Sequence, residues 1–378
     1  MKKKIVFINQ STGYLTIDII NNFVKHYDEV ALIFGNIRVQ DIQLDAKVRK
    51  VKVMQRSQVS HVRRFMAWLL ASVQIFFILL FKFRKYEIFY FSLPPFSYLS
   101  SLILRNKFSL LMFDVYPDVL KMINIKETNI VYRIWAGWNK KLFIKAHKVF
   151  TIGDSMADLM AQYAPREKIH VIPLWTGLAN VLPVMKSENI FIKENNLEGK
   201  FIVQYSGNIG ATHNIESLIE VAKLLKDQLD IAFVIIGRGF KVPAVKKVIE
   251  EYNLKNCMLL PFQPDDMIRY SIASADVSVV LIEEQVADVS IPSKVYNIMA
   301  VGSSLLSISP QTSEINKLIK QYKIGRNYLG TEVEKIADYI IELKQSPEKL
   351  QQYGSNAIEA SKNYTAANAD RFLELYQQ

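Results

Sequence analysis

A loop after a short apolar run carries the clearest chemical signal in the sequence. Phe201-Ile-Val-Gln-Tyr205 is typical of a strand, and Ser206-Gly-Asn-Ile-Gly-Ala-Thr-His-Asn214 leads from it into a predicted helix. Glycine lets the backbone approach a ligand, and the free N–H groups at a helix start attract phosphate. We therefore expect a diphosphate beside Gly207, Asn208 and Gly210, although a tight turn that needs glycine only for its dihedral angles explains the loop equally well. His213 is either a phosphate contact or a solvated polar residue.

A second loop, Gly237-Arg238-Gly239, follows the next predicted strand. The planar guanidinium of Arg238 suits a phosphate oxygen, while an exposed loop arginine is more commonly just solvated. Neither loop has the G-x-G-x-x-G spacing, and the loop after the first predicted strand, residues 9–13, lacks it too. These observations weaken a nicotinamide-dinucleotide interpretation.

A third segment supplies a cation at the start of a predicted helix. Pro292 suits the first turn, where the free amides of Ser293 and Lys294 point toward a ligand. The Lys294 ammonium could neutralise a leaving diphosphate.

Two carboxylates, Asp114 and Asp118, follow a predicted strand in the first half of the chain. Ligands collect at the carboxyl ends of parallel strands, which favours a site role for Asp114. The alternative for Asp118 is that it caps the helix that follows.

The elements that position these residues alternate between short apolar runs and longer runs of helical period, which is typical of a parallel sheet covered by helices. The 378 residues predict an α/β protein with two doubly wound domains. We expect residues 1–180 to form the first domain, 181–199 the linker and 200–365 the second domain. The predicted strands are 5–8, 29–34, 87–91, 108–113, 147–152, 201–205, 231–236, 257–260, 276–281 and 304–308. The predicted helices are 15–26, 61–82, 96–105, 129–145, 214–227, 243–252, 264–273 and 292–301.

Charge is divided unevenly between the two halves. Residues 1–180 hold 26 Lys and Arg against 12 Asp and Glu, a net charge of +14, whereas residues 181–378 hold 21 against 24, a net charge of −3. The basic half indicates an anionic partner such as a phospholipid surface, a phosphorylated lipid or nucleic acid, unless it is only a generically basic surface. Nucleic-acid binding is disfavoured, because the aromatic residues lie mainly in apolar runs.

Two features indicate where the chain acts. The single cysteine, Cys257, lies in a predicted buried strand, which excludes a disulfide framework or a thiolate metal cluster and fits a reducing cytoplasm. Helix 61–82 is apolar nearly all round, but it is somewhat short for a membrane span and contains Gln74. We expect this helix to be buried or to touch lipid in part.

These motifs together resemble one family. Pro292-Ser-Lys-x-Tyr-x-x-Met-Ala-x-Gly302, with Tyr205-Ser-Gly-Asn-Ile-Gly210 upstream, resembles the donor domain of family-four, or group 1, glycosyltransferases, most of all the capsule, O-antigen and exopolysaccharide branch. Residues 148–155 and 168–176 resemble the family's segment before its interdomain hinge. The resemblance implies the GT-B architecture, in which two Rossmann-like domains face each other across a cleft, with a last helix, 366–378, crossing back onto the first domain.

The resemblance also implies roles for individual residues. Val289 and Asn297 stand where many members have a glutamate pair, so Asp288 is expected to supply the first carboxylate, and the backbone of residues 260–263 is expected to meet the nucleobase. The donor-binding residues implied are Gly207, Asn208, Gly210, His213, Gly237, Arg238, Phe262, Gln263, Asp288, Ser290, Pro292, Ser293, Lys294 and Asn297. The expected catalytic residues are Asp114, Asp118, Lys294 and Arg238, and Ser11, Thr12 and Gly13 are expected on the acceptor side.

The sequence thus predicts an enzyme that transfers a sugar from a nucleotide diphosphate, UDP in the first instance, to a polyprenyl-diphosphate-linked glycan. Its basic half would hold it at the cytoplasmic face of the membrane. No zinc ligand set or Asp-x-Asp signature appears, so neither a metal nor another cofactor is expected. The resemblance favours retention of configuration at the anomeric carbon. The alternatives are a GT-B epimerase or phosphorylase, whose characteristic residues are not found, and a nucleic-acid- or membrane-binding protein without activity.

Overall fold

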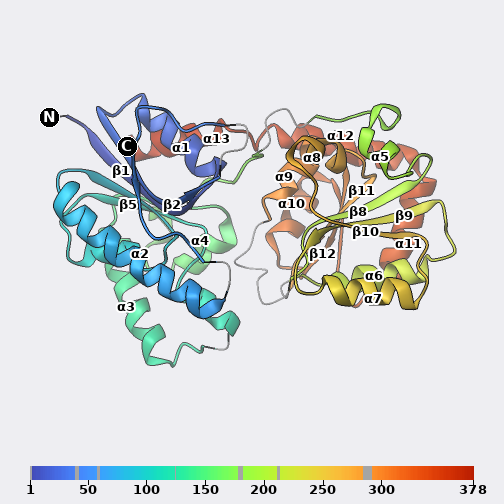
Figure 1. Cartoon of the computed structure of the whole chain (residues 1–378), viewed down its shortest axis with the longest axis horizontal. Coiled ribbons are helices and arrows are strands. Elements are labelled where there is room, and N and C mark those ends of the chain that lie inside the picture. The colour runs from blue at the N-terminus through green and yellow to red at the C-terminus, as the bar shows by residue number, and fades with distance from the viewer. Residues whose placement is uncertain are drawn as a thin grey trace. The chain divides into compact units, whose positions relative to one another are not determined.

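The computed structural model describes residues 2–38, 42–57, 60–123, 125–177, 182–210, 213–283 and 292–378. The chain forms two compact units (Figure 1): unit 1 consists of residues 1–177 and 366–378, and unit 2 of residues 178–365. Unit 2 therefore lies in the sequence between two pieces of unit 1.

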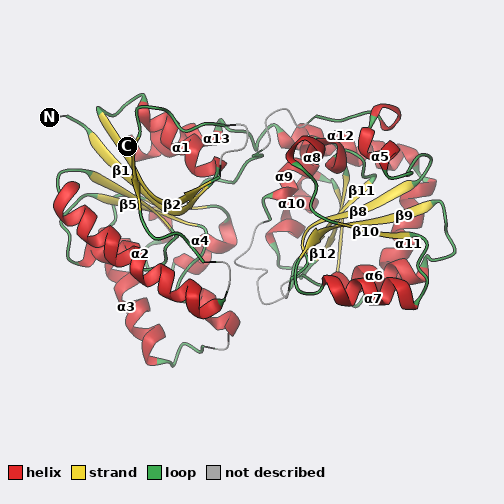
Figure 2. Ribbon diagram, in the orientation of Figure 1, coloured by secondary structure: helices red, strands yellow, loops and turns green. Residues whose placement is uncertain are grey.

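In the described part of unit 1, seven parallel strands form one sheet in the order β3-β2-β1-β4-β5-β6-β7. The strands are β1 (Lys4–Thr12), β2 (Glu29–Ile37), β3 (Arg49–Lys52), β4 (Glu87–Phe91), β5 (Phe108–Met112), β6 (Val149–Thr151) and β7 (Ile169–Val171). The α-helices are α1 (Tyr14–Val24), α2 (His61–Lys82), α3 (Ile130–Lys145), α4 (Asp154–Met160) and α13 (Asn368–Gln377). The 3₁₀ helices are η1 (Ser97–Leu102), η2 (Asp118–Ile123) and η3 (Arg166–Lys168). Helices α1 and α13 cover one face of the sheet, and α2 and α3 cover the other (Figure 2).

Continuous apolar runs make the inner strands of unit 1, because a parallel strand covered on both faces needs apolar residues on both. Residues 5–8 of β1 have no exposed surface. Helix α13 closes this core from the far end of the chain. The Tyr376 ring lies 5.3 Å from that of Phe23, and its hydroxyl donates a hydrogen bond to Glu87 at 2.7 Å.

In the described part of unit 2, six parallel strands form a sheet in the order β10-β9-β8-β11-β12-β13. The strands are β8 (Phe201–Asn208), β9 (Ile231–Arg238), β10 (Cys257–Leu260), β11 (Val277–Leu281), β12 (Ser304–Ile308) and β13 (Gly325–Tyr328). The helices are η4 (Lys186–Glu188), α5 (Ile190–Glu194), α6 (Ile215–Leu224), α7 (Val242–Glu251), α8 (Asp265–Ile272), α9 (Lys294–Ala300), α10 (Glu314–Tyr322), α11 (Val333–Gln345) and α12 (Pro347–Ser361).

Alternate residues of β8 face opposite layers of unit 2, as the pleat of a strand requires. Val203 and Tyr205 belong to an apolar cluster with residues of α6, α7 and α11. Ile202 belongs to a second cluster with residues of α5 and α8. Helices therefore cover both faces of this sheet as well (Figure 2).

The segment predicted as a linker, 181–199, packs on unit 2 instead. Phe191, Ile192 and Leu197 are buried in the same cluster as Ile202. The buried Asn189 side chain donates a hydrogen bond to the Tyr270 carbonyl at 2.9 Å. Three buried apolar residues are enough to attach a segment whose average composition is polar.

The predicted α/β class with two doubly wound domains is confirmed. Strands β8 and β9 are longer than predicted, and the predicted helix 96–105 is the 3₁₀ helix η1. The sequence did not indicate β3, β7 or α4, which have only four, three and seven residues.

Candidate functional site

Strands β8 and β9 end side by side at the candidate nucleotide site of unit 2. Their register pairs Gly207 with Gly237 and Asn208 with Arg238. The glycines let the two backbones pass closely, since a Cβ on Gly237 would lie 2.1 Å from the Gly207 carbonyl oxygen. A Cβ on Gly210 would lie 2.5 Å from Asn208 Nδ2, so Gly210 leaves room for that amide.

The loop predicted to hold a diphosphate is shorter in the structure than the sequence pattern indicates. Strand β8 continues to Asn208, so Gly207 lies within it, and α6 begins at Ile215, one residue after the predicted start. The turn of α6 is capped by Asn214, whose Oδ1 accepts a hydrogen bond from the Ser217 amide at 3.2 Å. Gly207, Asn208 and Gly210 therefore shape the carboxyl end of the sheet and are separated from the helix.

Lys294, the first residue of α9, brings a cation to this strand end. Its Nζ donates to the Ser206 carbonyl at 3.1 Å and lies 4.1 Å from the centre of the Tyr205 ring. Among the described residues, no carboxylate forms an ion pair with it. Burial lowers the pKa of Lys294 from 10.5 to about 7. An anion placed here would restore the ammonium charge.

His213 lies close enough to feel that charge. Burial, followed by the charges of Lys294 and Lys241, lowers the pKa of His213 to about 4. The Lys241 ammonium donates to the His213 carbonyl at 3.1 Å and to Glu216 at 2.9 Å. The imidazole is therefore uncharged at neutral pH in the empty site.

Arg238 and Phe262 form an exposed planar surface at the ends of β9 and β10. The guanidinium lies 5.1 Å from the centre of the Phe262 ring, a cation–π arrangement. Phe262 keeps 42% of its surface exposed. Next to it, Gln263 Nε2 donates to the Pro261 carbonyl at 2.9 Å. The arrangement offers a flat apolar face and a phosphate donor together.

The other predicted donor residues fall around α9 or outside the described part. The predicted helix 292–301 begins at Lys294, with Pro292 and an exposed Ser293 before it. Asn297 lies one turn into α9. Asp288 and Ser290 lie outside the described residues.

In unit 1, the ends of β1, β4 and β5 enclose a cavity of about 180 Å³. Ser11, Gly13 and Asp114 line it, so the structure brings two of the three predicted acceptor-side residues to a predicted catalytic carboxylate. Thr12 is buried and its hydroxyl donates to the Asn9 carbonyl at 3.0 Å. Burial raises the pKa of Asp114, and the charge of Arg56 opposes the rise. A carboxylate with a raised pKa is suited to proton transfer.

Asp118 does not fit its predicted catalytic role. Its carboxylate is buried and accepts hydrogen bonds from the hydroxyls of Tyr132 at 2.6 Å and Tyr163 at 2.5 Å. Lys121 and Gln162 contact the same group at 3.0 and 3.2 Å. Four partners from η2, α3 and the end of α4 make Asp118 a structural anchor.

Helix α2 carries an unusual exposed face. Residues 62–82 are long and apolar enough to cross a membrane, yet only 22% of the most apolar stretch is buried. The exposed positions recur every three or four residues and form what we call the apolar face of α2: Val62, Phe65, Leu69, Val73, Phe77 and Phe81. Arg63, Lys82, Arg84 and Lys85 flank it. A face of this kind marks an interaction surface.

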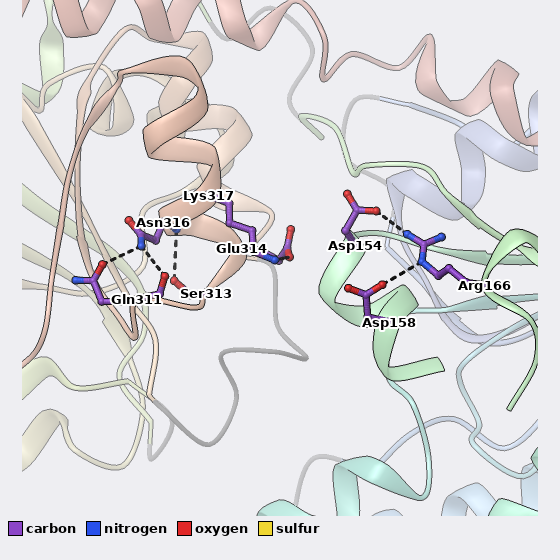
Figure 3. A network of polar contacts seen from close by, with 8 residues as sticks. All are labelled: Asp154, Asp158, Arg166, Gln311, Ser313, Glu314, Asn316 and Lys317. Carbon is purple, nitrogen blue, oxygen red and sulfur yellow. Dashed lines mark hydrogen bonds and ion pairs between the residues drawn. The ribbon is translucent and has the colours of Figure 1, made fainter. Parts of the chain in front are cut away.

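Two polar networks stabilise loops elsewhere (Figure 3). In unit 1, Arg166 bonds Asp154 at 2.7 Å and Asp158 at 3.1 Å, which joins η3 to α4. In unit 2, Asn316 Nδ2 donates to Gln311 Oε1 at 3.0 Å at the start of α10. These groups are engaged within their own unit, and we assign them to structure.

Sequence reasoning missed Arg56 and Lys241. Arg56 follows β3, a strand of four residues that the pattern did not indicate. Lys241 precedes α7. Its position three residues after Arg238 could have indicated that it lies near the same site.

One part of the chain matches a known protein family. Residues 186–360 match the family described as glycosyl transferases group 1. The matched segment lies within unit 2 and makes up a little under half of the chain. It includes both glycine loops and the segment of Lys294, so the match supports the donor-domain part of the resemblance stated from the sequence.

Two curated relatives are named as glycosyltransferases. The chain is 30% identical to the probable glycosyltransferase WbjE of Pseudomonas aeruginosa over 224 residues, 58% of this chain and 56% of that protein. It is 28% identical to the putative colanic acid biosynthesis glycosyl transferase WcaI of Escherichia coli K12 over 178 residues, 46% of this chain and 43% of that protein. The chain thus spans about half the length of the curated relatives it matches.

Solved structures extend the similarity beyond the group 1 domain. Sucrose-phosphate synthase of Thermosynechococcus elongatus matches with a TM-score of 0.75 at 14% identity, over 100% of this chain and 99% of that one. Anabaena HepE, solved in complex with UDP and glucose, matches with a TM-score of 0.72 at 13% identity, over 98% of each chain. At these identities the similarity concerns the fold, which is GT-B as predicted.

Proposed function

We propose that this protein is a glycosyltransferase of bacterial surface-polysaccharide synthesis. A sugar passes from UDP, bound by unit 2, to a hydroxyl of a lipid-linked glycan bound by unit 1. The observation that carries the proposal is Lys294, a partly buried cation with a pKa of about 7 and no carboxylate partner in the described part of the chain. The names of WbjE and WcaI and the UDP and glucose bound to HepE support the reaction class and the donor.

In the proposed reaction, the diphosphate gains negative charge as its bond to the anomeric carbon breaks. Lys294 and Arg238 stabilise that charge in place of a divalent metal, and no cofactor takes part. Asp114 orients the acceptor hydroxyl, and the leaving diphosphate helps to remove its proton, with retention at the anomeric carbon.

The proposal also locates the protein at the cytoplasmic face of the membrane, without a span. The apolar face of α2 enters the headgroup region, and the flanking basic residues meet anionic phospholipid. This location brings unit 1 to a lipid-linked acceptor.

A thermal-shift panel of UDP, GDP, ADP, CMP and NAD tests the donor assignment. A ligand at one hundred times its Kd stabilises the folded state by about 2.7 kcal/mol. We expect UDP to raise the melting temperature of the wild type and of Lys246→Ala, which removes an exposed lysine of α7, but not of Lys294→Ala. No shift with any nucleoside diphosphate, or a shift with NAD alone, contradicts the proposal.

A further inference from the structure

A groove in unit 1 has features that donor binding does not explain. The ends of β1, β2 and β3 and the first turns of α2 enclose about 640 Å³. Gln10 fixes the base of the groove, because its Nε2 donates to the carbonyls of Met54 at 2.8 Å and Ala67 at 3.3 Å. Arg56 and Arg63 line one part, and the apolar lining consists chiefly of Met54, Val62, Met66 and Leu70.

Arginines form the basic part of the groove. In the described ranges, neither Arg56 nor Arg63 nor the neighbouring Arg64 forms an ion pair with a carboxylate. Burial is the main cause that lowers the pKa of Arg56, and the charge of Arg64 lowers it further. The charges of Tyr116 and Asp114 raise this pKa and oppose the shift in part. The Nε of Arg64 is also buried without an acceptor among those residues. Guanidinium groups gathered in this way repel one another, and an anionic ligand relieves the repulsion.

The apolar part of the groove indicates a ligand that has a hydrocarbon portion as well as a negative charge. Val62 is 73% exposed, and Met66 and Leu70 are each 45% exposed. Met66 and Leu70 lie on α2 beside Phe65 and Leu69, so the groove continues into the apolar face of α2. A hydrocarbon chain leaving the groove can follow this helix.

We propose that the groove binds the diphosphate and the adjoining isoprenoid units of the lipid-linked acceptor, an inference that rests on the proposed function. Arg56 and Arg63 bind phosphate oxygens, and Met54, Met66 and Leu70 contact the hydrocarbon. Ser11 lines both this groove and the small cavity of Asp114, so a sugar attached to the diphosphate extends toward that carboxylate.

Calorimetric titration of the full chain with farnesyl diphosphate tests the assignment. We expect binding at least tenfold tighter than that of inorganic pyrophosphate, farnesol or dihexanoyl phosphatidylglycerol. Arg56→Ala with Arg63→Ala should weaken farnesyl diphosphate at least tenfold, and Met66→Ser with Leu70→Ser should remove its advantage over pyrophosphate. The matched control is Arg133→Ala, which removes an exposed arginine of α3 and should leave binding unchanged.

The UDP thermal shift distinguishes this inference from the proposed function. It should be unchanged in the groove variants, which also verifies that they fold, and farnesyl diphosphate should still bind Lys294→Ala. Loss of farnesyl diphosphate binding in Lys294→Ala but not in the arginine variants, or equal binding of phosphatidylglycerol, overturns the inference while the UDP site stands. Absence of a UDP shift in the wild type overturns the proposed function itself.

Discussion

At the scale of single residues, Lys294 of the 292–302 motif makes the expected binding of UDP depend on pH. Its pKa of about 7 means that the empty site loses its ammonium charge as the pH rises above neutrality. A bound diphosphate favours the charged form, so binding takes up a proton above pH 7. We expect UDP affinity to fall between pH 7 and pH 9, by up to about tenfold per unit. Titration calorimetry in buffers of different ionisation enthalpy measures both quantities.

Lys294→Arg provides the control for this pH dependence. Arginine stays charged throughout the range, so its UDP affinity should vary much less between pH 7 and pH 9. Equal pH profiles for lysine and arginine would show that another group titrates.

The sequence predicted residues of unit 2 better than those of unit 1. Gly207 and Arg238 lie at the ends of β8 and β9, whose apolar patterns are strong, and Lys294 begins α9, so their place at the sheet end could be inferred. Three partners of Asp118, namely Tyr132, Gln162 and Tyr163, lie 14 to 45 residues away in the sequence, so they could not be inferred from its local pattern. Arg56 was hidden because its strand has only four residues.

Among the elements, α2 exposes an apolar stripe that runs along most of its length. The sequence predicts a helix that is buried or touches lipid in part. In the structure only one side is buried, where Ala71, Ile75 and Leu79 pack inward. The length of an apolar run does not tell which face a neighbour covers, so the exposed stripe could be seen only in the structure.

Phe77→Ser with Phe81→Ser tests whether this stripe contacts lipid. The two side chains are 50% and 74% exposed, so the double variant should keep its melting temperature. Each exposed Phe gains about 2 kcal/mol on entering an apolar phase, so retention by anionic vesicles in a sedimentation assay should fall at least tenfold. Leu224→Ser with Leu229→Ser, both 54% exposed in unit 2, is the control. Equal losses in both double variants would argue against a specific membrane face.

For the whole molecule, the chain connects its two units twice, after Gly177 and before Ala366. The segment just before the first connection is held on unit 1 by Trp175. Its Nε1 donates a hydrogen bond to Asp18 at 2.7 Å, and its carbonyl accepts one from the Tyr14 hydroxyl at 2.9 Å. The return brings α13 onto α1.

Phe372→Ala tests the contribution of α13 to unit 1. The ring is 1% exposed and lies 5.1 Å from that of Phe150, so its removal should cost unit 1 about 3–5 kcal/mol. Scanning calorimetry should show a lower transition for unit 1, while the transition that UDP raises stays in place. Ile103→Ala, 73% exposed in the same unit, should change neither. A common shift of both transitions would mean that the units unfold together.

The two-part construction of unit 1 also sets an order of events during synthesis. Residues 178–365 leave the ribosome before α13 does, so unit 2 can complete its sheet while Phe23 and Phe89 still lack the cover of Tyr376, and Phe150 that of Phe372. A nascent chain interrupted just before Ala366 would therefore hold one finished domain beside one with uncovered aromatic rings. Such a fragment is a substrate for chaperones and proteases rather than a smaller enzyme.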